Sequence, residues 1–162
     1  MSTPQATTHR DLIESIAAQI ADGEREAPTE AEIDRYAEEL PEVGELSIGD
    51  AAAIVGVEAT TVRYYEDEGL LSVPRLPNGH RRFDSDALSA LLFVHRMRLS
   101  GLSVRDIARL QQLLASDDDG ARAEAQELLH THAREVRRRI AQLQISLAIT
   151  EHKIQHLSRR TP

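Results

Sequence analysis

Two neighbouring stretches of the chain concentrate side chains that can bind a polyanion. Residues 60–71, TTVRYYEDEGLL, carry two hydroxyls, an arginine and two adjacent tyrosines, and residues 73–83, VPRLPNGHRRF, add three arginines and a histidine. Hydroxyl, guanidinium and phenol groups hydrogen-bond to phosphate oxygens, and arginine also recognises base edges in the major groove of DNA. The candidate contact residues are Thr60, Thr61, Arg63, Tyr64, Arg75, His80, Arg81 and Arg82.

Two short helices are expected to position the first stretch. Ser47 is a suitable N-cap for the helix IGDAAAIV (48–55), and Gly56 ends that helix. A second helix is predicted for residues 59–68. Two short helices joined by a tight turn that contains glycine form a helix-turn-helix, whose second helix enters the major groove.

The second stretch is predicted to form a β-hairpin. Asn78-Gly79 is a strong signal for a tight turn, because both residues accept a positive φ. A small ribbon after a helix-turn-helix is a wing, and its arginines usually hold the DNA backbone that flanks the bases being recognised. The pattern therefore predicts a mostly α chain that contains a winged helix-turn-helix with a small β-hairpin wing.

The remaining segments are predicted to be helical. A hydrophobic content of 41% with only 3% aromatic residues suits packed helices better than sheets. Residues 84–86 cap a helix that ends at Ser100-Gly101, and Ser103 caps another. The run SDDDG (116–120) is interpreted as a solvated turn that ends this second helix.

The last segment, from residue 121 to about 158, has the pattern of a coiled coil. It contains neither proline nor glycine, and its apolar residues alternate spacings of four and three, with Thr150 as one polar interruption. Residues 130–157 would form a rod of about 40 Å with one narrow apolar seam, which predicts dimerisation through a coiled coil, with folding back on the N-terminal segment as the alternative. The dimerisation residues are Val136, Ile140, Leu143, Leu147, Ile154 and Leu157.

The net charge of −8 is unevenly distributed. Residues 1–45, the acidic leader, carry twelve acidic side chains and three arginines, whereas residues 46–162 carry sixteen basic and fifteen acidic side chains. The overall charge therefore does not argue against a nucleic-acid partner. We predict three segments: the acidic leader, a winged helix-turn-helix domain (46–116), and a linker with a dimerisation helix (117–162).

The acidic leader is predicted to hold two short helices, with Thr29 and Glu32 forming a capping box ahead of the second. Their apolar stripes are too narrow to fold alone, which favours a loosely docked or partly disordered tail; a partner-binding or regulatory hairpin is the alternative. Such a hairpin could compete with phosphate or contact RNA polymerase. The apolar residues are Leu12, Ile13, Ile16 and Ile20 in the first helix, and Ile33, Tyr36 and Leu40 in the second.

Several classes of protein are excluded by composition. The chain has no cysteine, so disulfides, thiolate metal sites and cysteine nucleophiles are absent. No apolar run approaches the roughly 20 residues that span a bilayer, which predicts a soluble cytoplasmic protein that does not bind membranes. No phosphate-cradling glycine loop, HExxH motif or serine elbow is present, so we expect no enzyme.

The motifs LSIGDAAAIVGVEATTVRYYEDEGLL, NGHRRF and RMRLSGLSVRDIARL resemble the MerR family of bacterial transcription regulators over residues 46–115. The resemblance implies a homodimer, joined through an antiparallel coiled coil, that binds a two-fold-related promoter element in double-stranded DNA. It also implies that the dimer distorts the DNA so that polymerase can engage it. It implies base or phosphate contacts from Thr60, Thr61 and Arg63, backbone contacts from Tyr64 and Arg81, and an inward-facing Tyr65.

The sequence departs from the family pattern at three positions of this region. Glu58 stands where serine is usual, which makes a weaker N-cap and adds a negative charge near phosphate. His80 and Phe83 stand where tyrosines are usual. We therefore expect operator affinity or sequence preference to differ from that of typical members.

The family's metal- and redox-sensing members use cysteines around the dimerisation helix, which this chain lacks. Histidines are the remaining metal candidates, and two of them lie at i, i+4 on one helix face. No carboxylate or thiolate completes a site, so solvated histidines, no metal and no cofactor are predicted. The candidates are His130, His132, His152 and His156.

Two rival functions remain beside a transcription regulator. An architectural repressor or an excisionase-like protein would bend DNA without activating transcription, and in-vitro transcription would separate it from an activator. An interaction protein would recruit a partner through the acidic leader and the coil, with DNA contact secondary.

Overall fold

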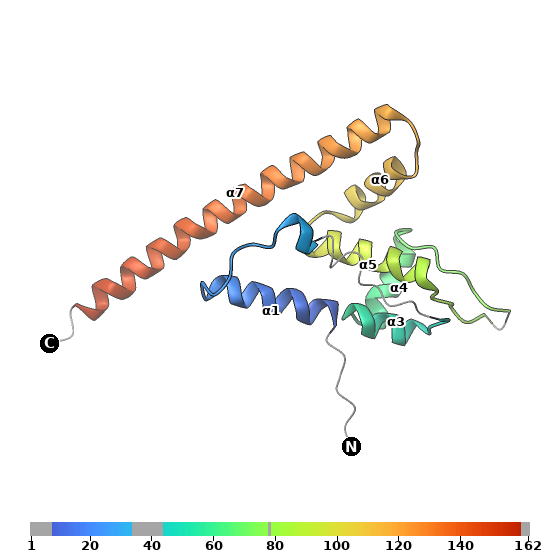
Figure 1. Cartoon of the computed structure of the whole chain (residues 1–162), viewed down its shortest axis with the longest axis horizontal. Coiled ribbons are helices and arrows are strands. Elements are labelled where there is room, and N and C mark those ends of the chain that lie inside the picture. Colours follow the sequence, from blue (N-terminus) through green and yellow to red (C-terminus); the bar gives the residue numbers. More distant parts are fainter. Residues whose placement is uncertain (1–7, 34–43, 78, 160–162) are drawn as a thin grey trace, which may run out of the picture. The chain divides into compact units, whose positions relative to one another are not determined.

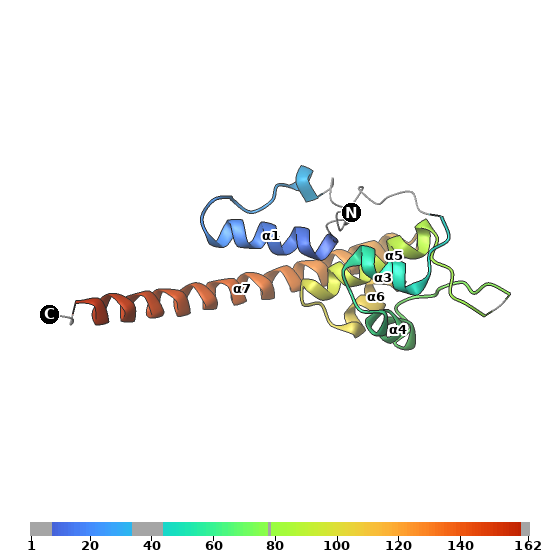
Figure 2. The same cartoon turned by 90° about the horizontal axis from the view of Figure 1, so that it is seen from below.

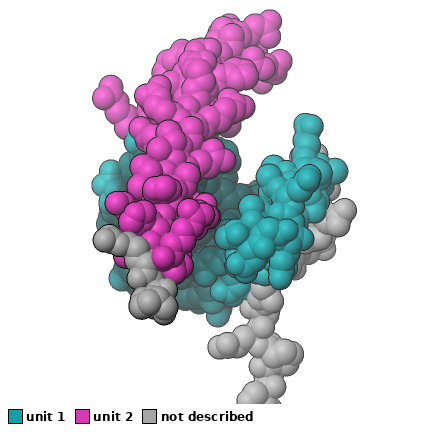
Figure 3. Space-filling model, turned by 90° about the vertical axis from the view of Figure 1, so that its left-hand side faces the viewer, with its two compact units in different colours: residues 1–104 teal, residues 105–162 magenta. Residues whose placement is uncertain are grey.

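The computed structural model describes residues 8–33, 44–77 and 79–159 (Figure 1). The chain divides into two compact units, residues 1–104 and residues 105–162 (Figure 3). The described residues are mostly helical with two isolated antiparallel bridges, which confirms the predicted mostly α class. The three predicted segments, with boundaries after residues 45 and 116, do not follow this division and stay a prediction.

Helices α3 (Ile48–Val55) and α4 (Ala59–Asp67) form the predicted helix-turn-helix. Ser47 caps α3, because its hydroxyl accepts a hydrogen bond from the backbone N–H of Asp50 at 3.2 Å. Gly56 ends α3 with φ at 84°, a left-handed conformation that glycine adopts without steric cost. The two helices pack together around fully buried Ala51, Val55 and Val62.

Helix α1 (His9–Ala21) packs against α3, as Figures 1 and 2 show. Its N-terminal turn lies over Gly56, where an added Cβ atom would be 2.7 Å from the Cβ of Arg10 and 2.8 Å from the Oγ1 of Thr8. Ile16 is buried, while Ile13 and Ile20 are 37% and 38% exposed. Within the acidic leader, residues 9–21 thus form a helix that is docked on α3.

The capping box at the second leader helix is present. The Thr29 N–H donates to Oε2 of Glu32 at 2.9 Å, and the Glu32 N–H donates to Oγ1 of Thr29 at 3.4 Å. Residues 30–33 are helical. Tyr36 and Leu40, which were predicted to continue the apolar stripe, lie outside the described residues.

The predicted wing is a hairpin whose arms are joined by few backbone hydrogen bonds. The Leu76 N–H donates to the carbonyl of His80 at 2.8 Å, and Arg75 lies opposite Arg81 in an antiparallel bridge. Asn78, one of the two predicted turn residues, lies outside the described residues. The hairpin prediction is confirmed, although the arms form an isolated bridge rather than a continuous ladder.

The base of the wing is joined to the chain that enters α3. Leu46 and Phe83 exchange both backbone hydrogen bonds, at 2.8 and 3.0 Å. Phe83 is fully buried, and helix α5 (Ser85–Leu99) begins directly after it with Asp84 as its N-cap. This pairing fixes the wing to the helix-turn-helix.

The second unit contains most of α6 (Val104–Leu114) and the 40-residue α7 (Asp119–Ser158). The side chain of Asp118 caps α7, so Asp119 and Gly120 belong to its first turn and the predicted SDDDG turn is shorter than expected. Arg109 of α6 pairs with Glu124 of α7 at 2.6 Å. Among the described residues, no helix combines the length and apolar character needed to cross a membrane.

Candidate nucleic-acid interface

Helix α4 has one buried face and one exposed face. Val62 is fully buried and Tyr65 is 4% exposed, so both point into the core. Thr60 and Arg63 are exposed, and Tyr64 is 45% exposed. Positions three and four apart share a helix face, so these three side chains form one outward surface. Thr61 is only half-buried at the margin of that surface.

The two adjacent tyrosines have different roles. Their ring centroids are 6.0 Å apart with an interplanar angle of 51°, so one ring packs inward while the other stays at the surface. Burial raises the pKa of Tyr65, and the positive charge of Arg98 opposes that shift. The prediction that Tyr65 packs inward is confirmed, and the Tyr64 hydroxyl keeps a phenol at the surface.

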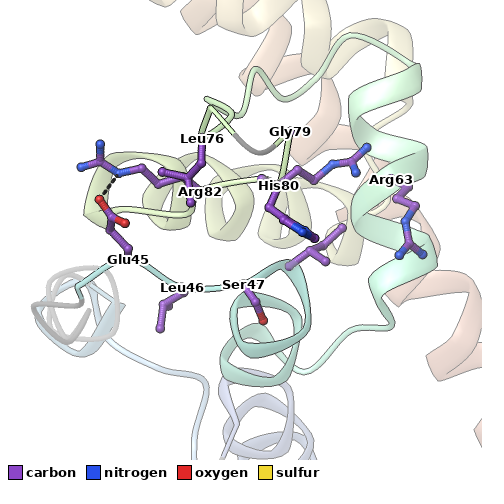
Figure 4. Close-up of a pocket in the computed structure, with 10 residues that line it drawn as sticks. Glu45, Leu46, Ser47, Arg63, Leu76, Gly79, His80 and Arg82 are labelled. Atoms are coloured by element: carbon purple, nitrogen blue, oxygen red, sulfur yellow. Dashed lines mark ion pairs between the residues drawn. The ribbon is translucent and has the colours of Figure 1, made fainter.

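A hollow of about 460 Å³ lies between α4, the start of α3 and the wing (Figure 4). It brings together Arg63 of α4 and three predicted contact residues of the wing, His80, Arg81 and Arg82. Figure 4 shows Arg63 on one side of the hollow and Arg82 on the other. Thr60, Thr61, Tyr64 and Arg75 do not line it.

Two of these arginines form ion pairs that sequence reasoning missed. Nε of Arg81 donates to Oε2 of Glu66 on α4 at 2.5 Å, with side-chain exposures of 22% and 13%. Nε of Arg82 lies 3.1 Å from Oε1 of Glu45, with exposures of 42% and 55%. The sequence shows acidic residues in α4 and just before α3, but it does not show which arginines they pair with. Pairing across 15 and 37 positions cannot be inferred from spacing.

The other cationic groups of the surface are held more loosely. Nη1 of Arg75 donates to the carbonyl of Gly79 at 3.2 Å, within the wing itself. No ion pair joins Arg63 to another described residue, so its charge is available to a ligand. Glu58 precedes α4 as its N-cap residue but makes no side-chain capping hydrogen bond. This leaves N–H groups at the start of α4 open to an anion.

The predicted dimerisation seam is exposed along α7. Ile140, Leu143 and Leu147 are 49%, 62% and 58% exposed, and Ile154 and Leu157 are 58% and 67% exposed. Val136 is half-buried. Only Ala125 is buried among the described residues of this helix. The seam is thus unpartnered in a single chain, and dimerisation stays a prediction.

The histidines of α7 do not gather into a metal site. His130, His132, His152 and His156 all lie on this one helix. Within the described ranges, no group of three or more histidine, aspartate or glutamate side chains could hold a metal ion.

Comparisons with known proteins agree with this geometry. The family model "MerR HTH family regulatory protein" matches residues 46–114, and "MerR, DNA binding" matches residues 88–149. The HTH-type transcriptional regulator HmrR of Rhizobium leguminosarum bv. viciae is 33% identical over 109 residues, which cover 67% of this chain and 84% of that protein. The mercuric resistance operon regulatory protein of Shigella flexneri is 35% identical, over 60% of this chain and 67% of that protein.

A solved structure extends the likeness to three dimensions. HiNmlR, a MerR family regulator lacking the sensor domain and bound to promoter DNA, matches with a TM-score of 0.61 and 30% identity, over 72% of this chain and 92% of that chain. The two family models together cover the whole helix-turn-helix, the wing and most of α7. This chain belongs to the MerR family of DNA-binding transcriptional regulators.

Proposed function

We propose that the chain acts as a homodimer that binds a two-fold-related promoter element in double-stranded DNA and regulates transcription from it. One observation carries the proposal: the exposed face of α4 adjoins a hollow whose rim holds Arg63, Arg81 and Arg82. A helix that presents hydroxyl and guanidinium groups beside an arginine-bearing ribbon suits a major groove and the phosphates that flank it. The similar structure of HiNmlR bound to promoter DNA supports DNA binding by this chain.

The proposed contacts divide by element. Thr60, Thr61 and Arg63 meet base edges or phosphates, while Tyr64 meets the backbone through its exposed hydroxyl. Arg75, His80 and Arg82 meet backbone phosphates from the wing. Arg81 has its Nε committed to Glu66, so it contacts DNA through its terminal nitrogens and also keeps the wing against α4.

The exposed seam of α7 supports the homodimer. Large apolar side chains that are half or more exposed along a 40-residue helix are stabilised by pairing with a second copy. A two-fold dimer would carry two copies of α4, which fits an operator made of two related half-sites. We place the two α7 helices antiparallel.

DNA distortion and polymerase contact complete the proposal. Smoothly bending a DNA site costs roughly 1–6 kcal/mol. Contacts outside the bases being recognised supply the free energy for this distortion. The wing provides such contacts, since its arginines are not part of α4, the helix proposed to contact the bases. RNA polymerase is the proposed partner at the promoter.

The test uses full-length protein and a duplex enriched by the wild-type chain from a random-sequence pool. Arg63→Ala is expected to weaken binding about tenfold, because a lost base or phosphate contact is worth about 1–3 kcal/mol. Arg138→Ala is the control, since Arg138 is exposed on α7 away from the seam. Equal affinity of the two variants would contradict the proposed surface.

A further inference from the structure

The acidic leader ends inside the candidate interface. Glu45, its last residue, precedes Leu46, which exchanges two backbone hydrogen bonds with Phe83 at the base of the wing. These bonds hold the Glu45 backbone beside the arm that carries Arg82. Figure 4 shows the Glu45 carboxylate directed at Arg82 on the rim of the hollow.

The contact between the two side chains is electrostatic and easily exchanged. Oε1 of Glu45 lies 3.1 Å from Nε of Arg82, yet that buried Nε has no hydrogen bond of suitable geometry. Both side chains are about half exposed, at 55% and 42%. Ion pairs with such exposure contribute little to stability, so a better acceptor can replace the carboxylate.

The neighbouring pair of Arg81 and Glu66 is different. It is a hydrogen bond of 2.5 Å between side chains that are only 22% and 13% exposed. A ligand cannot replace Glu66 without opening this contact between α4 and the wing. Glu45 is therefore the carboxylate of the hollow that a phosphate can displace.

We propose that Glu45 is an internal counter-ion that DNA phosphate displaces from Arg82, so that this one residue lowers DNA affinity and its dependence on salt. The inference rests on the proposed function, because it assumes that Arg82 meets a DNA phosphate. A phosphate offers charged acceptor oxygens to the half-exposed guanidinium of Arg82, which Glu45 holds only by an ion pair. The released Glu45 carboxylate then turns to solvent.

The salt dependence follows from counting ions. A free arginine that binds phosphate causes release of about one condensed counterion from DNA, which steepens the plot of log affinity against log salt. In the wild-type chain, Arg82 exchanges the Glu45 carboxylate for a DNA phosphate, and the released carboxylate takes up a counterion from solution. This uptake nearly offsets the counterion that DNA releases. Arg82 therefore steepens the plot of log affinity against log salt only when Glu45 is removed.

The experiment compares Glu45→Gln with the wild-type full-length chain on the enriched duplex, at several salt concentrations. We expect affinity to rise about threefold at low salt, and the slope to steepen by about one. Glu24→Gln is the matched control, because Glu24 is an exposed carboxylate of the leader that forms no ion pair with another described residue, and the substitution changes charge equally. It should change affinity less than twofold and leave the slope unchanged.

Arg82→Gln tests whether the gain acts through the proposed partner. In an Arg82→Gln background, Glu45→Gln should no longer raise affinity or steepen the slope. The inference is overturned if Glu45→Gln matches Glu24→Gln, if it weakens binding, or if its gain persists without Arg82. Failure of the wild-type chain to enrich any duplex is a separate result that would contradict the proposed function itself.

Discussion

Arg81 of the wing donates a hydrogen bond from Nε to the carboxylate of Glu66 on α4, 15 residues away in sequence. This pair joins the two elements that carry the proposed DNA contacts. The two side chains are largely buried, with exposures of 22% and 13%. Removing one of them leaves the other as a largely buried charge without its partner.

Glu66→Gln is expected to destabilise the chain by about 1–2 kcal/mol and to weaken DNA binding, because the wing loses its fixed position. Chemical denaturation and duplex titration measure the two effects. Glu14→Gln is the control, since Glu14 pairs with Arg10 on the exposed surface of α1 and its loss should change stability much less. Equal costs for the two variants would contradict a joining role for Glu66.

The position of His95 in the core leads us to expect that the folded chain loses stability in acid. His95 is only 7% exposed, and neither ring nitrogen has a hydrogen-bond partner among the described residues. Arg10 of α1 is the charged group that acts on it. Burial lowers the pKa of His95 below its ordinary value of 6.5, and the positive charge of Arg10 lowers it further. The unfolded chain therefore binds a proton more readily than the folded chain.

The sign of the effect follows from this difference in proton binding. Stability is fully present above pH 6.5 and falls as the pH drops toward the folded-state pKa, by up to about 1.4 kcal/mol per pH unit. His95→Leu should flatten this part of the pH profile of unfolding. An unaltered profile in His95→Leu would contradict the assignment.

Replacing Gly56 by a residue with a side chain is expected to cause a steric clash where α1 contacts the helix-turn-helix. An alanine there would adopt an unfavourable positive φ, and its Cβ would collide with Thr8 and Arg10. Gly56→Ala should cost at least about 2 kcal/mol. Gly69 has a similar φ of 71° but no atom within 4 Å of an added Cβ, so Gly69→Ala should cost only about 1 kcal/mol. Similar melting temperatures for the two variants would show that α1 does not pack at Gly56.

The dimerisation seam predicts a face-specific effect on assembly. Leu143 and Ile145 are 62% and 63% exposed, but only Leu143 belongs to the seam. Leu143→Lys should therefore produce monomers, while Ile145→Lys should leave the dimer intact. Sedimentation equilibrium distinguishes these results, and dissociation in both variants or in neither would argue against the seam.

Local elements of the fold could be predicted from the sequence because each has a short-range cause. Ser47 and Gly56 delimit α3 through a cap and a left-handed residue, and the structure confirms both. Tyr65 was assigned to the core and is buried. These features depend on residues within a few positions of one another, which a sequence displays directly.

The contacts that organise the candidate interface have long-range causes. Glu45 and Glu66 reach their arginines only after the wing folds back, so neither pair is visible in spacing. Packing of α1 over Gly56 depends on the absence of a side chain 46 positions away from Arg10, which the apolar periodicity of α1 does not reveal. The two ion pairs and the packing of α1 over Gly56 all depend on tertiary contacts, which cannot be inferred from composition.

The central claim is that two copies of α4 and the wing bind one DNA site, and hydroxyl-radical footprinting on the enriched duplex tests it most directly. We predict two protected regions related by two-fold symmetry and separated by about one helical turn or a multiple of it. Arg63→Ala should weaken both regions equally. A single asymmetric protected region, or protection that Arg63→Ala leaves unchanged, would contradict the account.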